Sequence, residues 1–314
     1  MRPSAAREVA APPAAGFDLS EREFAILREL VAERTGIALG PHKRALLQAR
    51  LAPRLRALGL RTFAEYRRAF AALDPASEEA ARFVNAVTTT KTEFFRESRH
   101  FAYLTGQWLP RAVARAARGG PRRLRIWSAA CSSGEEPYSL AMTAIDALAE
   151  GPAWDVRILA SDINTDVLRR AAAGIYRQDA LSALPRTTLR RHFLRGRGAS
   201  TGLVRVRPEI RRLVAFRRIN LVDGAWPGAG GKPIRTRFDA VFCRNVLMYF
   251  DRPTQQRVLR RLADHVADGG VLVLGHSEGV RGLLSGLRHL GSAIYLKETA
   301  PPKETAHAGD HPRR

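Results

Sequence analysis

The sequence predicts an α/β fold in which a parallel sheet follows a helical region and carries a small antiparallel insertion. The main observation is the stretch 124–140, LRIWSAACSSGEEPYSL, which reads as a buried strand, a turn of small residues ending at Gly134, and a helix that opens on Glu135, Glu136 and Pro137. Proline suits the first helical turn because its missing N–H would have no partner there, and carboxylates suit it because the helix dipole is positive at that end. A strand, a glycine turn and a helix in this order form the nucleoside sites of open α/β sheets.

A second strand points to the same site. The stretch 156–162 reads as a strand that ends on Asp162, and a carboxylate at the tip of the second strand is placed to accept hydrogen bonds from ribose hydroxyls. A helix cap is the alternative role for Asp162, although Asn164 and Thr165 could cap the next helix equally well. The first turn has neither a G-x-G-x-x-G fingerprint nor the lysine of a P-loop. We therefore expect a nucleoside ligand without a pyrophosphate, of which S-adenosylmethionine is the common one.

Helical periodicity marks the chain before this sheet. Ser20 and Glu23 form a capping box at the start of the first helix, and Gly36 is expected to end that helix. The stretch 42–70 that follows carries eight basic residues and one acidic residue, Glu65. Its leucines recur at a helical spacing, which predicts a buried stripe with a basic surface beside it.

Three arginines of this basic stretch are candidate substrate-binding residues. Arg50, Arg54 and Arg61 would lie together on a continuous helix. Pro53 is expected to interrupt that helix, because proline lacks the N–H that the helix interior needs. A docking surface for an acidic partner and an ordinary solvated face both remain open as readings of these charges.

The segments of the chain follow from its composition and from its glycines and prolines. An Ala/Pro-rich start, the glycines and proline at 119–121, and three glycines between 196 and 202 ahead of short apolar runs suggest the boundaries. We expect a disordered tail at 1–16, a helical domain at 17–87, a linker and helix carrying ligand-site residues at 88–120, the sheet domain at 121–297 with the antiparallel insertion at about 177–217, and a second disordered tail at 298–314.

The net charge is the unusual quantity in the composition. The chain has a formal net charge of +22, whereas its 45% hydrophobic and 26% charged residues are ordinary for a globular protein. A large positive potential attracts nucleic acid, anionic lipid or an acidic protein surface, and its sign alone does not choose among them. With two cysteines and no apolar run long enough to cross a membrane, we expect a reduced, cytoplasmic protein without membrane insertion.

Seven segments resemble one known family, and they occur in the family's order. They are TTTKTEFFRE at 88–97, WSAACSSGEEPYS at 127–139, ASDINTDVL at 160–168, GIY at 174–176, GLVRVR at 202–207, FCRNVLMYFD at 242–251 and GHSE at 275–278. The sequence thereby resembles the chemotaxis receptor methyltransferases, the CheR family of S-adenosylmethionine-dependent protein-glutamate O-methyltransferases. The resemblance extends over about residues 18–297, and seven matches in order are far more specific than any one of them.

The resemblance implies a Rossmann-like methyltransferase domain with an inserted antiparallel β-subdomain, preceded by an all-helical domain. It also implies a set of residues that contact S-adenosylmethionine and its product S-adenosylhomocysteine: Thr90, Thr92, Arg96, Glu136, Asp162, Asn220, Leu221, Arg244 and Asn245. Arg96 and Tyr249 stand where the family has its substrate-positioning pair. One departure is Thr90, since family members often carry Asn there and a side-chain amide contact becomes a hydroxyl contact.

The implied chemistry needs positioning rather than acid–base catalysis. A glutamate side chain has a reference pKa near 4.3, so it is already a carboxylate at neutral pH. The remaining tasks are to desolvate the carboxylate and to align it with the methyl group, for which an arginine fork and a tyrosine hydroxyl are suited. A core aromatic is the alternative role for Tyr249. We interpret Cys131 and Cys243 as structural, and we find no metal ligands at a characteristic spacing.

The leading hypothesis is methyl esterification of glutamates on the cytoplasmic helices of bacterial chemoreceptors, for sensory adaptation. The basic stretch would meet the acidic helical substrate, the β-subdomain would bind a C-terminal receptor peptide as an added strand, and we expect a monomer. A nucleic-acid methyltransferase is one alternative, but the chain lacks the Asn/Asp-Pro-Pro-aromatic and Pro-Cys motifs of those enzymes, and we expect no nucleic-acid partner. A non-catalytic, cofactor-binding adaptor is the other alternative.

Overall fold

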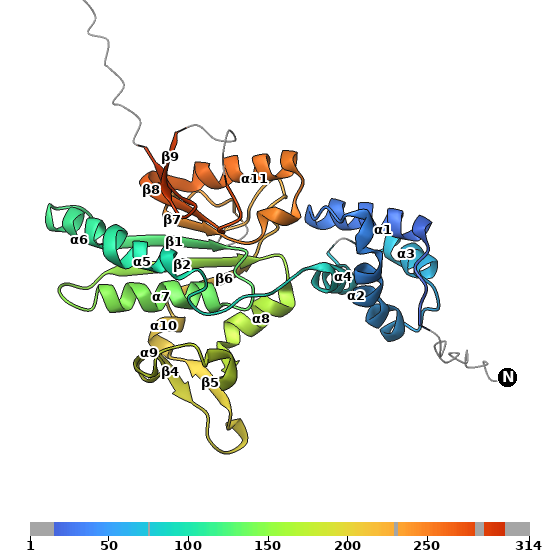
Figure 1. Ribbon diagram of the computed structural model, residues 1–314, viewed down its shortest axis with the longest axis horizontal. Helices are drawn as coiled ribbons and strands as arrows, with labels where there is room; N and C mark the ends of the chain where they lie inside the picture. Colours follow the sequence, from blue (N-terminus) through green and yellow to red (C-terminus); the bar gives the residue numbers. More distant parts are fainter. Residues whose placement is uncertain (1–15, 75, 229–231, 280–285, 299–314) are drawn as a thin grey trace, which may run out of the picture.

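The computed structural model describes residues 16–74, 76–228, 232–279 and 286–298. The two tails that the sequence predicts to be disordered lie, except for residues 16 and 298, outside the described residues. Figure 1 shows a helical domain beside an open sheet whose two faces carry helices, with a smaller sheet below them.

The helical domain consists of four α-helices that share one apolar core. They are α1 (Glu21–Thr35), α2 (Arg44–Ala57), α3 (Phe63–Ala71) and α4 (Glu78–Val87), with the 3₁₀ turn η1 (Pro41–Lys43) before α2. Their shared core includes Leu27, Leu47 and Phe83. The predicted start and end of α1 are confirmed, because the Ser20 hydroxyl accepts a hydrogen bond from Glu23 N at 3.2 Å and Gly36 ends the helix at a φ of 75°.

The predicted interruption of the basic helix at Pro53 is wrong. Helix α2 continues through Pro53 to Ala57, because Leu47, Leu51 and Leu55 form a fully buried stripe along it. The packing of this stripe outweighs the one backbone hydrogen bond that proline cannot donate. Arg61 follows the end of α2, so it does not share a helix with Arg50 and Arg54.

The main sheet has seven strands in the order β6-β2-β1-β7-β8-β10-β9. Their bounds are β1 (Arg123–Ala129), β2 (Asp155–Asp162), β6 (Val214–Arg218), β7 (Phe238–Cys243), β8 (Val266–Leu274), β9 (Leu287–Gly291) and β10 (Ile294–Lys297). Strand β10 is antiparallel to β8 and β9, and the other neighbouring pairs are parallel. The chain passes from β1 to β2 on one side and reaches β7 on the other, so the order reverses at β1. A crevice at the carboxyl ends of the strands is expected at such a point.

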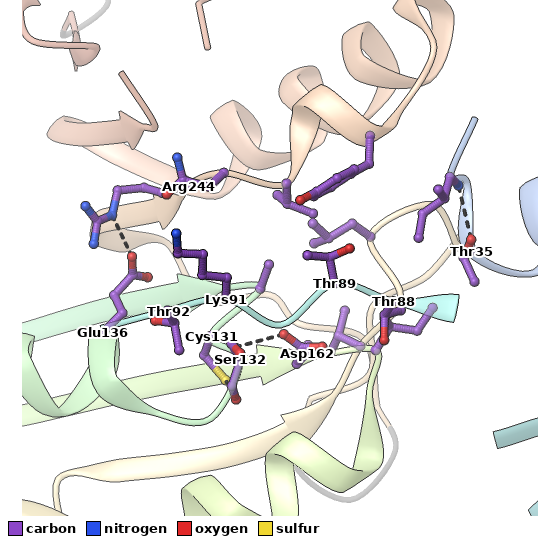
Figure 2. Close-up of a pocket in the computed structure, with 18 of the residues that line it drawn as sticks. Thr35, Thr88, Thr89, Lys91, Thr92, Cys131, Ser132, Glu136, Asp162 and Arg244 are labelled. Carbon is purple, nitrogen blue, oxygen red and sulfur yellow. Dashed lines mark hydrogen bonds and ion pairs between the residues drawn. The ribbon is translucent and has the colours of Figure 1, made fainter. Parts of the chain in front are cut away.

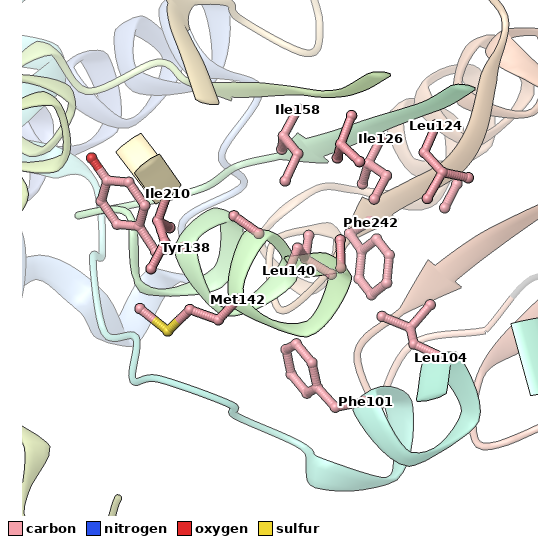
Figure 3. Packing of buried hydrophobic residues seen from close by; sticks show 14 of the residues in the cluster. Phe101, Leu104, Leu124, Ile126, Tyr138, Leu140, Met142, Ile158, Ile210 and Phe242 are labelled. Atoms are coloured by element: carbon pink, nitrogen blue, oxygen red, sulfur yellow. The ribbon is translucent and has the colours of Figure 1, made fainter. Parts of the chain in front are cut away.

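Helices cover both faces of this sheet. They are α5 (Ser98–Tyr103), α6 (Leu109–Ala117), α7 (Glu135–Ala147), α8 (Thr165–Ala173) and α11 (Arg252–His265), with a π-helical turn at Leu104–Trp108. Side chains alternate along β1, so that Leu124 and Ile126 join the core beneath α7 while Trp127 joins the core beneath α11. Figure 3 shows the first of these cores, in which residues of α5 and α7 meet β1 and β2.

The small antiparallel sheet has three strands in the order β3-β5-β4. These are β3 (Ile175–Arg177), β4 (Phe193–Arg195) and β5 (Leu203–Val206), with α9 (Arg186–His192), α10 (Pro208–Arg211) and the 3₁₀ turns η3 (Gln178–Leu181) and η4 (Gly198–Ser200) around them. The predicted end of the insertion at about residue 217 is too late. Residues 214–218 form β6, which pairs in parallel with β2 at the edge of the main sheet. A short apolar run has the same appearance in either sheet.

Candidate functional site

A pocket lies at the carboxyl ends of β1, β2 and β7, where the strand order reverses (Figure 2). Its lining comes from six parts of the chain: the end of α1, the linker after α4, and the loops after β1, β2, β6 and β7. The lining residues are Thr35, Ile37, Thr88, Thr89, Lys91, Thr92, Arg96, Ala130, Cys131, Ser132, Glu136, Asp162, Ile163, Ile219, Asn220, Leu221, Arg244, Asn245, Val246, Tyr249 and Phe250.

The turn after β1 gives the pocket a wall with short side chains. Ala130 and Ser132 have left-handed backbones, with φ of 72° and 49°, and Gly134 follows at 98°. A Cβ on Gly134 would lie 2.9 Å from both Ala171 Cβ and the Tyr176 hydroxyl, so only glycine fits between α8 and β3. Strained backbone in non-glycine residues is found mainly where a ligand site requires it. The turn therefore leaves room for a ligand to approach the main chain.

The Asp162 carboxylate is fixed at the end of β2. Its Oδ2 accepts a hydrogen bond from Ser132 N and its Oδ1 accepts one from Asn164 N, each at 2.9 Å. Burial raises the pKa of Asp162, and these backbone hydrogen bonds oppose the rise. Asn164 is the residue that caps α8, so the alternative role of helix cap does not fall on Asp162. Each carboxylate oxygen retains a lone pair for a ligand hydroxyl.

Glu136 and Arg244, both expected to contact a cofactor, form a buried ion pair with each other. Arg244 Nε lies 2.6 Å from Glu136 Oε2, and the Ser128 hydroxyl donates to Glu136 Oε1 at 2.6 Å. Arg244 Nη1 also donates to the Arg96 carbonyl at 2.6 Å. Both side chains line the pocket, so they shape it as a pair rather than as two free charges. Figure 2 shows the pair at one end of the pocket.

Arg96 and Tyr249 line the same pocket from two separate segments, Arg96 from the linker after α4 and Tyr249 from the loop after β7. Arg96 uses Nη1 to donate to the Lys91 carbonyl at 3.0 Å. Tyr249 belongs to the 3₁₀ turn η6 (Leu247–Tyr249), and its carbonyl accepts a hydrogen bond from Ala38 N at 2.8 Å. The helical domain thus contacts the loop that carries Tyr249.

The linker after α4 crosses the pocket and is held at several points. The Ser132 hydroxyl donates to the Thr90 carbonyl at 2.9 Å, and Asn164 Nδ2 donates to the Thr88 hydroxyl at 2.7 Å. Thr90 is not among the lining residues, whereas Thr89, Lys91 and Thr92 are. The threonine run signalled the segment, but not which of its side chains would face the pocket.

Two further predicted residues lie at the end of the pocket nearest the helical domain. Asn220 and Leu221 both line it. The Asn220 amide donates to the Arg34 carbonyl at 3.1 Å and to Asp223 Oδ1 at 2.8 Å, so it also joins α1 to the sheet domain. Thr35 and Ile37 line the pocket as well, and no local sequence pattern marks them, because they reach it through the contact between the domains.

The three arginines of the basic stretch have different surroundings. Arg50 donates to the Val87 carbonyl and, at 2.8 Å, to the Thr89 hydroxyl. Arg54 is paired with Glu79, its Nε lying 3.0 Å from Glu79 Oε1. Arg61 is exposed in the turn that precedes α3. Arg50 and Arg54 line one groove between α2, α4 and α8, and Arg61 is not among its lining residues.

The two cysteines interpreted as structural are both buried. Burial raises the pKa of the Cys131 and Cys243 thiols well above the ordinary value, which keeps both protonated.

His276, Glu97 and His100 bring possible metal-ligand atoms within 4.8 Å of one another. However, Arg244 Nη1 lies 3.2 Å from His100 Nδ1, and His100 Nε2 bonds to the Ser292 carbonyl at 2.7 Å. Both ring nitrogens of His100 therefore already have partners, and the positive charge of Arg244 lies beside the ligand atoms that a metal would need.

Two family models match the chain. Residues 22–88 match the all-alpha domain of CheR methyltransferase, and residues 90–296 match its SAM binding domain. The chain is 43% identical to the "Chemotaxis protein methyltransferase" of Klebsiella aerogenes, over 88% of this chain and 90% of that protein, and 43% identical to "Chemotaxis protein methyltransferase 2" of Pseudomonas aeruginosa, over 89% and 94%. The Escherichia coli protein is 41% identical over 88% and 91%.

None of the described helices is both long and apolar enough to span a membrane. The matched domains follow the division seen in the structure, since their junction falls in the linker after α4. The second matched domain contains the switch-point pocket, and the first contributes Thr35 and Ile37 to it. The chain belongs to the CheR methyltransferase family, and it is an S-adenosylmethionine-dependent methyltransferase.

Proposed function

We propose that this enzyme transfers a methyl group to glutamate side chains on the cytoplasmic helices of chemoreceptors, giving glutamate methyl esters and S-adenosylhomocysteine. The observation that carries the proposal is that Arg96 and Tyr249 line one pocket together with Asp162. A residue pair suited to a carboxylate and an acceptor suited to a ribose thus share one cavity.

The residues of the pocket fit the cofactor. Asp162 keeps lone pairs for two hydroxyl groups, and the backbone turn after β1 leaves space beside it. The Glu136–Arg244 pair lies at one end of the pocket, away from Asp162 (Figure 2), and Asn245 also lines the pocket. These polar groups are suited to the amino and carboxylate groups of an amino acid. When bound, S-adenosylmethionine supplies an electrophilic methyl group on a sulfonium sulfur.

The protein's part in the reaction is to hold the acceptor carboxylate. Because this group is ionised at neutral pH, no residue has to remove a proton from it. Arg96 and Tyr249, which both line the pocket, bind and orient its oxygens, and enclosure in the pocket removes part of the hydration of these oxygens. The negative charge of the acceptor is lost on ester formation, so a loose contact with Arg96 serves the reaction better than a tight ion pair.

The acceptor is proposed to dock on basic surfaces of the helical domain. Among the three arginines predicted for this role, Arg50 lies nearest the pocket, through its contact with Thr89. Arg54 is compensated by Glu79 and Arg61 lies outside α2. The edges of the small sheet, β3 and β4, could each add a receptor C-terminal peptide as a further strand. We propose that the enzyme acts as a monomer in the cytoplasm.

The test is a methylation assay on purified receptor with S-adenosylmethionine labelled in its methyl group. We expect label on the receptor that alkali releases as methanol, as a carboxyl methyl ester requires. Arg96→Ala should lower kcat by at least about tenfold, since a positioned charged hydrogen bond is worth about 1.5–3 kcal/mol. Arg22→Ala, at an exposed position of α1, is the matched control. Label that withstands alkali would exclude the ester.

A further inference from the structure

Glu278 lies outside the pocket, and its carboxylate holds the segment that carries Asn245 and Tyr249. It is 8% exposed and follows β8 in a turn closed by a hydrogen bond from Glu278 N to the Gly275 carbonyl at 2.8 Å. Its Oε2 accepts from Asn245 N at 2.8 Å and from Gly275 N at 2.9 Å. Its Oε1 accepts from Leu247 N at 2.8 Å and from Met248 N at 3.3 Å.

The segment 245–249 needs such an outside acceptor. Asn245 has a left-handed backbone with a φ of 59°, and the short 3₁₀ turn after it begins at Leu247. The first N–H groups of a helical turn have no partner within the turn. The Glu278 carboxylate supplies these partners from another part of the chain, and a carboxylate has enough lone pairs to accept all four hydrogen bonds.

Two neighbours support this contact. A Cβ on Gly275 would lie 2.9 Å from Asn245 N and 2.8 Å from Glu278 Oε2, so the residue at 275 has to be glycine for the approach to occur. On the other side, Asn245 Nδ2 donates to Glu97 Oε1 at 3.1 Å. Asn245 is therefore fixed between two carboxylates, by its main chain on Glu278 and by its side chain on Glu97.

We propose that Glu278 is a positioning residue for methyl transfer, which fixes the segment 245–249 so that the Tyr249 hydroxyl faces the acceptor carboxylate. This inference rests on the role proposed above for Tyr249. A displacement of about 1 Å at a reacting group can lower the rate by about 100-fold, so a group that fixes this backbone acts on kcat without touching the substrate. A glutamine at 278 would turn its NH₂ group toward two of the N–H donors and repel them.

The test is a double-mutant cycle of Glu278→Gln and Tyr249→Phe, with kcat and KM measured on purified receptor and with unfolding followed in urea. We expect each single change to lower kcat by about tenfold or more. The double variant should be within about threefold of Tyr249→Phe alone, because once the hydroxyl is gone its position no longer matters. Gly275→Ala, which crowds the same contact from its other side, should show the same non-additivity. Glu150→Gln, at an exposed loop position, is the control.

The outcomes separate the two proposals. If Glu278→Gln lowers kcat by the same factor with Tyr249 and with Phe at position 249, or only lowers stability, Glu278 does not position Tyr249. If Tyr249→Phe itself leaves kcat unchanged, the role of Tyr249 in the reaction is wrong, and the positioning inference falls with it. Non-additive losses in kcat, with both Glu278→Gln and Gly275→Ala folded, would establish the inference.

Discussion

At the scale of single residues, Asp162 should decide cofactor affinity. Its carboxylate is held by two backbone N–H groups and faces the pocket. We expect Asp162→Asn to weaken S-adenosylhomocysteine binding by about 10- to 100-fold, because hydrogen bonds to a charged group are worth about 1.5–3 kcal/mol. Titration calorimetry measures this. Asp166→Asn, an exposed acid on α8, is the control, and an unchanged dissociation constant in Asp162→Asn would place the ribose elsewhere.

A buried histidine should make stability depend on pH. Burial lowers the pKa of His100 below its ordinary value of 6.5, and the nearby Arg244 and His276 lower it further, while the Ser292 carbonyl and Glu97 oppose the shift. The unfolded chain therefore binds a proton at higher pH than the folded chain does. The stabilising contribution is complete above about pH 6.5 and is lost as the pH falls toward the folded-state pKa.

The variant His100→Gln isolates this contribution. Its amide can still donate to the Ser292 carbonyl, which His100 Nε2 bonds at 2.7 Å, but it does not titrate. Urea unfolding at pH 7.5, 6.5 and 5.5 should show a smaller loss of unfolding free energy in the variant than in the parent protein. Equal losses in the two proteins would show that another group causes the acid sensitivity.

Local patterns identified much of the candidate site, but not how its charges are paired. The strand, turn and helix around Gly134 and the acid at the end of β2 follow from nearby residues, and the structure places both at the pocket. The pairing of Glu136 with Arg244 joins residues 108 positions apart, and no spacing rule reveals it. The same limit hid the contribution of α1, because a long-range contact exists only after the domains pack. Lys91 was missed for another reason, since the threonine run does not show which side chains of that segment face the pocket.

At the scale of whole elements, burial decided the cases in which the sequence was misread. The leucine stripe of α2 holds a helix across Pro53, although proline alone predicted a break. The run that forms β6 pairs with β2 instead of joining the small sheet. In both cases the local preference was real, and tertiary packing overrode it. Helix ends marked by caps, such as Ser20 and Gly36, were correct because capping is itself a local interaction.

Arg50 should limit the motion of the linker that crosses the pocket. It joins α2 to the Val87 carbonyl at the end of α4 and to the Thr89 hydroxyl. We expect Arg50→Gln to increase hydrogen exchange at residues 88–92 by about tenfold or more, since charged hydrogen bonds are lost. The KM for S-adenosylmethionine should rise several-fold as well. Arg61→Gln removes the same charge from an exposed turn, and an equal effect from it would mean that charge rather than this contact orders the linker.

At the scale of the whole molecule, two domains build one site. The helical domain contacts the sheet domain through Ala38 and the Tyr249 carbonyl, through Asn220 and the Arg34 carbonyl, and through Asn85 and Thr165. Asn220 and Tyr249, which take part in two of these contacts, also line the pocket. Asn85 and Thr165 line the groove that contains Arg50 and Arg54. These contacts therefore link the groove that contains Arg50 and Arg54 to the loop that carries Tyr249, the two places where the acceptor is proposed to bind.

The net charge of +22 then predicts how salt affects catalysis. The attraction between a basic enzyme and an acidic receptor helix acts between charges that are exposed to solvent, so dissolved salt screens it. The screening length falls from about 10 Å at 0.1 M salt to about 3 Å at 1 M. Salt should therefore raise the KM for the receptor steeply between 50 and 400 mM, because encounter is weakened. In the cofactor pocket, Glu136 and Arg244 already form a buried ion pair with each other, which salt screens little. The affinity for S-adenosylhomocysteine should therefore change much less over the same range. Steady-state kinetics with receptor and calorimetry with S-adenosylhomocysteine measure the two quantities separately.

A receptor KM that is independent of salt would show that the arginines of the helical domain do not guide the substrate. If salt raises the receptor KM and weakens S-adenosylhomocysteine binding in parallel, salt acts on the fold.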